Sequence, residues 1–104
     1  MKPSFILACT LLLFLSSAAQ AAPTAREICK KMIADGRGGG LNQATCECTY
    51  RVADAILDED VKTLLFEAWY TGKDNMGAVA KLPGQSRIRK QFKTMQRSLK
   101  PNCG

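Results

Sequence analysis

Two cysteines separated by a single residue, Cys46 and Cys48, constrain the fold of this chain more than any other feature. The surrounding sequence has helical periodicity, and a helix turns about 100° per residue, so the two side chains leave its axis about 200° apart. They are therefore not expected to pair with each other. The partners that remain downstream of residue 21 are Cys29 and Cys103. The spacing predicts two disulfides that diverge from one helix toward different neighbours.

Two pairings satisfy this geometry. We favour Cys29 with Cys48 and Cys46 with Cys103, and the alternative joins Cys29 to Cys46 and Cys48 to Cys103. In the chain-entropy estimate, bridges over loops of these lengths contribute roughly 3 and 4 kcal/mol. These contributions are large beside a typical domain stability of about 5 to 15 kcal/mol. We therefore expect a structural role for all four cysteines.

Redox and metal chemistry usually require other patterns. A redox pair is more typically Cys-x-x-Cys at a helix N-terminus, and a zinc site commonly includes histidine, which this chain lacks. Thiolates together with Met32, Met76 or Met95 would suit copper(I), but these methionines fit apolar helical stripes better. We expect neither a metal nor a cofactor.

Residues 1–21 have the pattern of an export signal. Lys2 precedes an apolar run over residues 5–15, and Ala19-Gln20-Ala21 has the small-x-small form of a signal peptidase site. We expect cleavage after Ala21, which leaves residues 22–104 as a single helical domain without a transmembrane segment. Lipidation at Cys9 is disfavoured because most of the apolar run would lie downstream of that cut. Export and an even number of remaining cysteines together predict a periplasmic or secreted protein.

The remainder of the sequence predicts an all-α, disulfide-stapled bundle of about four helices. Capping residues, glycines and prolines mark the helix ends, and apolar residues recur with helical spacing between them. Thr24 and Glu27 form a capping box, Asp58 and Ser86 are expected N-caps, and Pro101 is an expected stop. We expect long helices over residues 24–35, 42–57, 58–72 and 86–100, and a short helix over residues 74–82.

Positive charge is concentrated in the last helix. From Lys81 to Gly104 there are seven basic residues and no acidic one, whereas residues 22–80 carry seven basic and nine acidic residues. An apolar stripe in the last helix is expected to face the core, which leaves most of the basic residues, Arg87 among them, on its outer surface. This surface either only solvates the protein or docks on an anionic partner. The candidate partner-binding residues are Arg89, Lys90, Lys93 and Arg97.

No residue pattern indicates a catalyst. The chain has no histidine for a Ser-His or Cys-His pair, and the acidic cluster Asp58 to Asp60 resembles a helix cap with its dipole complement. We expect a monomeric, exported, non-catalytic binding or accessory protein whose partner is an anionic protein or an envelope component. Nucleic acid is disfavoured, because no aromatic series is interleaved with the charges to stack bases. The alternative is a membrane-active or toxin-like stapled helical protein.

Overall fold

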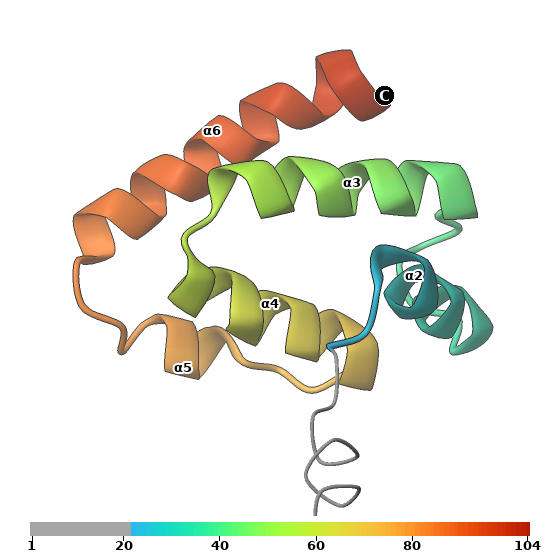
Figure 1. Ribbon diagram of the computed structural model, residues 1–104, viewed down its shortest axis with the longest axis horizontal. Helices are drawn as coiled ribbons and strands as arrows, with labels where there is room; N and C mark the ends of the chain where they lie inside the picture. Colours follow the sequence, from blue (N-terminus) through green and yellow to red (C-terminus); the bar gives the residue numbers. More distant parts are fainter. Residues whose placement is uncertain (1–21) are drawn as a thin grey trace, which may run out of the picture.

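The computed structural model describes residues 22–104, and the predicted export signal, with Cys9, lies outside the described residues. This part of the chain is entirely helical, with no strand, which confirms the predicted all-α class. It contains four long helices and the short helix that the sequence predicted between the third and the last of them. The helices are α2 Ala25–Ala34, α3 Gln43–Ile56, α4 Glu59–Thr71, α5 Met76–Val79 and α6 Gln85–Cys103 (Figure 1).

Helix α3 occupies the centre of the fold. Figure 1 shows it between α6 on one side and α4 on the other, with α2 packed against one end of the molecule. Helix α2 contacts both α3 and α4, α3 contacts α6, and the short α5 contacts α4. The Tyr50 ring of α3 stacks on Phe66 of α4 with ring centroids 4.2 Å apart. Helix α6, although last in the chain, lies beside α3 (Figure 1).

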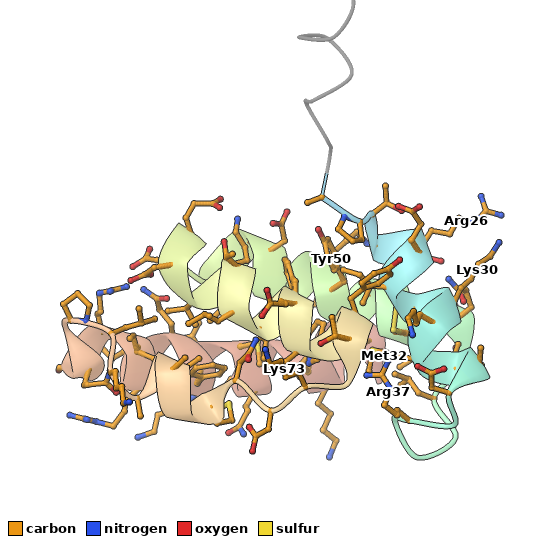
Figure 2. All side chains as sticks on the ribbon, turned by 90° about the horizontal axis from the view of Figure 1, so that it is seen from below. Arg26, Lys30, Met32, Arg37, Tyr50 and Lys73 are labelled. Atoms are coloured by element: carbon orange, nitrogen blue, oxygen red, sulfur yellow. A yellow bond between two sulfur atoms is a disulfide. The ribbon has the colours of Figure 1, made fainter. Side chains whose placement is uncertain are left out.

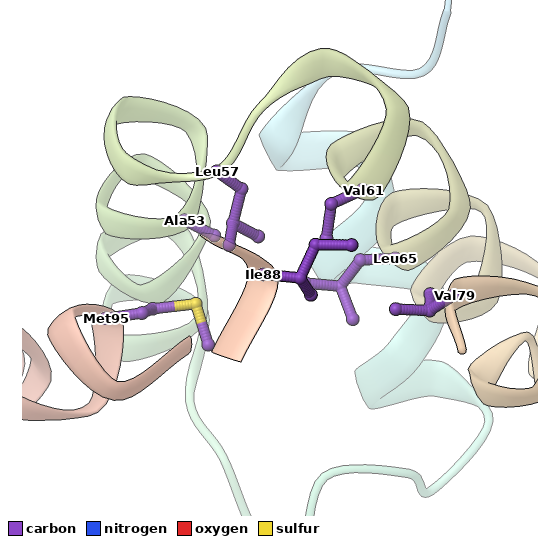
Figure 3. Close-up of a cluster of buried hydrophobic side chains, with 7 residues drawn as sticks. All are labelled: Ala53, Leu57, Val61, Leu65, Val79, Ile88 and Met95. Atoms are coloured by element: carbon purple, nitrogen blue, oxygen red, sulfur yellow. The ribbon is translucent and has the colours of Figure 1, made fainter. Parts of the chain in front are cut away.

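The hydrophobic core joins α3, α4, α5 and α6. Val61 and Leu65 of α4, and Ile88 and Met95 of α6, are buried, as the apolar spacing of these helices predicted. Burying a side chain of this size contributes about 1.5 to 3 kcal/mol relative to leaving it exposed. The short α5 therefore has a structural task, because it supplies Val79 to the same cluster. Figure 3 shows the cluster of Ala53, Leu57, Val61, Leu65, Val79, Ile88 and Met95.

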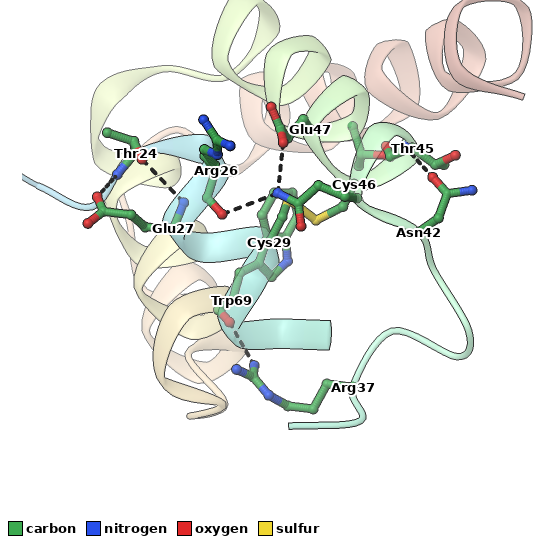
Figure 4. Close-up of a disulfide and its surroundings, with 12 residues drawn as sticks. Thr24, Arg26, Glu27, Cys29, Arg37, Asn42, Thr45, Cys46, Glu47 and Trp69 are labelled. Atoms are coloured by element: carbon green, nitrogen blue, oxygen red, sulfur yellow. Dashed lines mark hydrogen bonds between the residues drawn. A yellow bond between two sulfur atoms is a disulfide. The ribbon is translucent and has the colours of Figure 1, made fainter. Parts of the chain in front are cut away.

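Local residues mark the ends of α2, α3 and α4, and the sequence predicted the capping box of α2. The Thr24 backbone N–H donates to Glu27 Oε1 over 2.8 Å, and the Glu27 N–H donates to Thr24 Oγ1 over 3.2 Å (Figure 4). Asn42 caps α3 by accepting from the Thr45 N–H over 2.8 Å. Gly72 ends α4 in the left-handed region with φ of 80°, a conformation that glycine adopts without steric cost. These local signals set the bounds of α2, α3 and α4.

The loop after α2 contributes a cap to a distant helix. Arg37 donates from Nη1 to the Trp69 carbonyl over 2.7 Å (Figure 4). Its Nη2 donates to the Tyr70 carbonyl over 3.3 Å. These carbonyls lie in the last turn of α4, where backbone acceptors lack helical partners and a cation is favourable. The glycine-rich segment 36–40 thus positions a side chain that fastens α2 to α4.

Both ends of α6 differ from the prediction. The helix begins at Gln85 rather than after Ser86, and its N-cap is Gly84 in the left-handed region with φ of 73°. Pro101 does not stop the helix, which continues to Cys103. Proline removes one backbone donor, but the Asn102 side chain donates to the Ser98 carbonyl over 2.7 Å and the end of the helix is held by a disulfide.

The disulfide pairing that we favoured is wrong. The structure joins Cys29 to Cys46 and Cys48 to Cys103, so the bridges diverge from α3 as predicted but with the other connectivity. Cys46 faces α2 and is 3% exposed. The helical wheel placed Cys46 and Cys48 on two different sides of α3, and both sides carry apolar residues. Periodicity therefore separated the two bridges without showing which side of α3 faces α2.

Candidate functional site

The predicted partner-binding residues lie together on the outer side of α6. All four of them are exposed, while Ile88 and Met95 of the same helix are buried. With a turn of about 100° per residue, the four basic positions fall within about 100° of the helix circumference. We call this surface the basic face of α6, and it consists of Arg89, Lys90, Lys93 and Arg97.

No acidic side chain neutralises the basic face within residues 22–104. None of its four members takes part in an ion pair there. Each of the nine acidic residues, by contrast, accepts a hydrogen bond or joins an ion pair elsewhere. Other exposed cations within residues 22–104 also have no ion pair. They are Arg26, Lys30, Arg51, Lys73, Lys81 and Lys100. The four of the basic face, however, lie close together on one helix. Such a surface attracts anions over about a Debye length, which is ~8 Å at physiological ionic strength.

Arg87, which we expected on the outer surface of the last helix with the other basic residues, is engaged in ion pairs instead. It turns to the other flank of α6, where Nη1 lies 2.7 Å from Asp58 Oδ2 and Nη2 lies 2.7 Å from Asp60 Oδ2. Gln91 also donates to Asp58 Oδ2 over 2.8 Å. Asp58 occupies the N-cap position of α4 without bonding the helix backbone, because its carboxylate serves these partners instead. This cluster joins α6 to the start of α4 and has a structural role.

The cluster also sets the protonation of its acids. Hydrogen bonds from Gln91 and then from Arg87 lower the pKa of Asp58 below its ordinary value. The hydrogen bond from Arg87 lowers the pKa of Asp60 in the same direction. Both carboxylates are therefore ionised at neutral pH, and their negative charge is used within the fold.

A pocket that sequence reasoning missed adjoins the basic face between α5 and α6. Its volume is about 370 Å³. Two members of the basic face, Arg89 and Lys93, line it, and so does Met76, which is 54% exposed. No sequence signal indicated this pocket, because the exposure of Met76 depends on how α5 packs. The remaining lining residues are Val79, Ala80, Gln85, Ile88, Phe92 and Gln96.

A second pocket, of about 360 Å³, lies among α2, α3 and α4 and has a different chemical character. Its aromatic lining includes Tyr50, which is labelled in Figure 2, together with Phe66. Lys62 lines it as well and is engaged by Asp54 Oδ1 at 3.0 Å and Glu59 Oε1 at 2.9 Å. Burial raises the pKa of Tyr50, so its hydroxyl is protonated at neutral pH. This pocket offers no unpaired cation to an anion.

The disulfide Cys29–Cys46 joins α2 to α3 (Figure 4), and Gln43 of α3 also contacts α2. Gln43 Nε2 donates to Glu47 Oε2 over 2.7 Å and to the Arg26 carbonyl over 3.3 Å. Both sulfur atoms are in a bridge and their residues are buried, so this region is part of the scaffold. The four predicted disulfide cysteines all form bridges in the structure.

Searches for related proteins found no match among protein-family models, curated proteins or solved structures. Within residues 22–104, no helix has the length and apolar character needed to cross a membrane. In the same range, no group of three or more cysteine, aspartate or glutamate side chains is arranged to hold a metal ion.

Proposed function

We propose that this protein is an exported, non-catalytic binding or accessory protein whose basic face docks on an anionic partner. The observation that carries the proposal is the exposure of Arg89, Lys90, Lys93 and Arg97 on one side of α6 without an ion pair in residues 22–104. An acidic protein or an anionic component of the cell envelope would meet this surface. Complementary charge would steer the encounter and favour the correct orientation.

The distribution of charge supports a docking role over simple solvation. A solvating charge can lie anywhere on the surface, and its acidic and basic members are commonly interspersed. Here the acidic side chains take part in hydrogen bonds and ion pairs, while the four cations of the basic face are exposed on one side of α6. The arrangement presents one sign of charge to an approaching partner.

The two disulfides support a location outside the cytoplasm. Such bridges form and persist in oxidising compartments and are rare in the reducing cytosol. Their presence is compatible with a secreted or periplasmic protein, which is also what the pattern of residues 1–21 indicates.

The membrane-active alternative fits α6 less well, because the apolar face of this helix is already buried. A helix that inserts into the lipid interface needs an unoccupied apolar face. In this fold the apolar face of α6 packs into the core through Ile88 and Met95, and the end of the helix is tied to α3 by Cys103. Exposing that face to lipid would remove these side chains from the core. The docking role requires no such rearrangement.

The test compares two variants with the same change in charge. In the first, the four residues of the basic face are replaced by glutamate. In the second, the control, Arg26→Glu, Lys30→Glu, Arg51→Glu and Lys73→Glu reverse four other exposed cations, three of which are labelled in Figure 2. Only the first variant should lose retention on an anionic matrix and capture of its partners from envelope extract. Equal retention by both variants, with the fold intact by circular dichroism, would contradict the proposal.

A further inference from the structure

The pocket between α5 and α6 combines apolar walls with two cations on one side. Val79 and Ile88 are each 3% exposed and belong to the core, so these walls are firmly packed. Met76 is unlike them, because it is 54% exposed and has little packing around it. Methionine is unbranched and adapts its shape, so this side chain can cover a guest of variable form. The pocket therefore has a firm floor and an adaptable edge.

The charged side of the pocket comes from α6 alone. Arg89 and Lys93 are four residues apart, which places them one above the other on the same side of the helix. No acidic residue lines the pocket, and Gln85 is already engaged, since its side chain donates to the Val79 and Leu82 carbonyls. An anionic group at this side would meet two cations that have no ion pair in the described range.

From this combination we propose that the pocket binds a single-chain amphiphilic anion, such as a fatty acid, as a monomer. Its carboxylate lies against Arg89 and Lys93, and its alkyl chain lies between Met76 and the floor of the pocket. The inference rests on the proposed function, because it gives the chemical class of an anionic partner for part of the basic face. The pocket volume of about 370 Å³ lies within the range usual for small-molecule sites, which is roughly 300 to 1,000 Å³.

Other anionic partners would contact the cations of the pocket without filling its apolar part. A polysaccharide or inorganic phosphate would engage the cations but leave the apolar floor unfilled. The surface of an intact bilayer would meet the cations of α6 but would not fill the pocket between α5 and α6. A monomer with a free alkyl chain is the occupant that satisfies both the charge and the apolar walls.

The first measurement titrates the oxidised protein with octanoate, decanoate and dodecanoate below their micellar concentrations. Methyl-¹³C methionine NMR reports the site, because Met76 lines the pocket while Met32 lies on α2. The Met76 methyl resonance should shift and that of Met32 should not. Affinity should rise about fourfold for each added methylene that enters the pocket, the equivalent of ~0.8 kcal/mol. A purely electrostatic surface would show no dependence on chain length.

The second measurement uses variants that separate the pocket from the rest of the basic face. Arg89→Ala with Lys93→Ala removes the two cations of the pocket, whereas Lys90→Ala with Arg97→Ala removes two cations of the same helix that do not line it. The first pair should weaken dodecanoate binding by about three- to tenfold, the range expected for two exposed charge contacts. The second pair should leave the affinity nearly unchanged.

A third variant blocks the pocket without changing the charge. Ala80 is exposed, lines the pocket and has a right-handed helical backbone, so Ala80→Phe fits the local conformation. This variant should keep its thermal unfolding midpoint and its retention on an anionic matrix, and it should lose dodecanoate binding. Unchanged binding by Ala80→Phe would overturn the proposed site.

The outcomes also separate this inference from the proposed function. Equal weakening by both alanine pairs, or no increase in affinity with chain length, would overturn the pocket and leave the charged docking surface intact. Binding to anionic phosphatidylglycerol vesicles but not to monomeric dodecanoate would likewise overturn it and favour a membrane surface. Equal retention by the two glutamate variants would overturn the proposed function by itself.

Discussion

Arg87 of α6 lies 2.7 Å from Asp60 of α4, measured from Nη2 to Oδ2, and the same guanidinium also contacts Asp58. The two acids come from the start of one helix and the arginine from the first turn of another. A planar guanidinium can hold both carboxylates at once, which a lysine cannot do with the same geometry. This contact joins α6 to the start of α4 and occupies one flank of α6.

Arg87→Ala should lower the thermal unfolding midpoint by a few degrees, because it leaves Asp58 and Asp60 as neighbouring carboxylates without their shared cation. Arg89→Ala is the matched control on the same helix, since Arg89 is exposed and forms no ion pair in residues 22–104. It should change the free energy of unfolding by no more than about 0.5 kcal/mol. Equal shifts for the two variants would show that the cluster has no special role.

Stability should fall in acid as the pH drops below the ordinary aspartate pKa of 3.8. The pKa of Asp60 and that of Asp58 are lowered in the folded state, so the contribution of these groups is present above the unfolded pKa. It is lost as the pH falls through the lowered values. Urea unfolding at several pH values should show a smaller acid loss in Arg87→Gln than in the unaltered protein. The same acid loss in both would argue against this assignment.

Removing either disulfide should destabilise the protein by roughly 2 to 5 kcal/mol. The Cys48–Cys103 bridge spans 55 residues and Cys29–Cys46 spans 17, so the chain-entropy estimate gives the longer loop about 1 kcal/mol more. Paired serine variants and urea unfolding measure this difference. Peptide mapping under non-reducing conditions should recover Cys29 with Cys46, and recovery of Cys29 with Cys48 would contradict the structure.

The exported product should begin at Ala22 or Pro23, because Ala19-Gln20-Ala21 is the best small-x-small site in the N-terminal segment. Intact-mass measurement of the protein collected outside the cytoplasm tests this start. A product that retains residues 1–21, or that carries a lipid on Cys9, would contradict it.

Partner capture by the basic face should weaken as salt rises past about 0.15 M, where the Debye length is ~8 Å. The thermal unfolding midpoint measured over the same salt range should change much less, because α6 packs into the core through apolar side chains. Retention on an anionic matrix at increasing salt provides the comparison. Retention that is independent of salt would indicate a partner recognised without the charges of Arg89, Lys90, Lys93 and Arg97.

The helical architecture was largely predictable because its signals are local. The Thr24 and Glu27 capping box, the Asn42 cap and Gly72 each act within a few residues of the helix end that they define. The exposure of the basic face was predictable for a similar reason, since the spacing of Ile88 and Met95 already placed the cations on the outer side.

What the sequence could not predict depends on contacts between distant residues. Helical spacing places Arg87 about 200° around α6 from Arg89, but only the position of α4 brings Asp60 within reach of Arg87. Proline usually ends a helix, but α6 continues past Pro101. The disulfide from Cys103 to Cys48 of α3 holds the last turn of α6 in place. The pocket between α5 and α6 exists only because the short α5 packs near α6, and no periodicity encodes that distance.

The bridge from Cys48 to Cys103 makes the C-terminal end a suitable point for attaching the protein to a surface. Cys103 is 10 residues beyond Lys93 on the same helix, about 15 Å at a rise of ~1.5 Å per residue. A linker joined after Gly104 would therefore leave the molecule from an anchored point, remote from the opening between α5 and α6. Attached to a sensor chip or a bead through this end, every copy would present the pocket and the cations around it toward the solution.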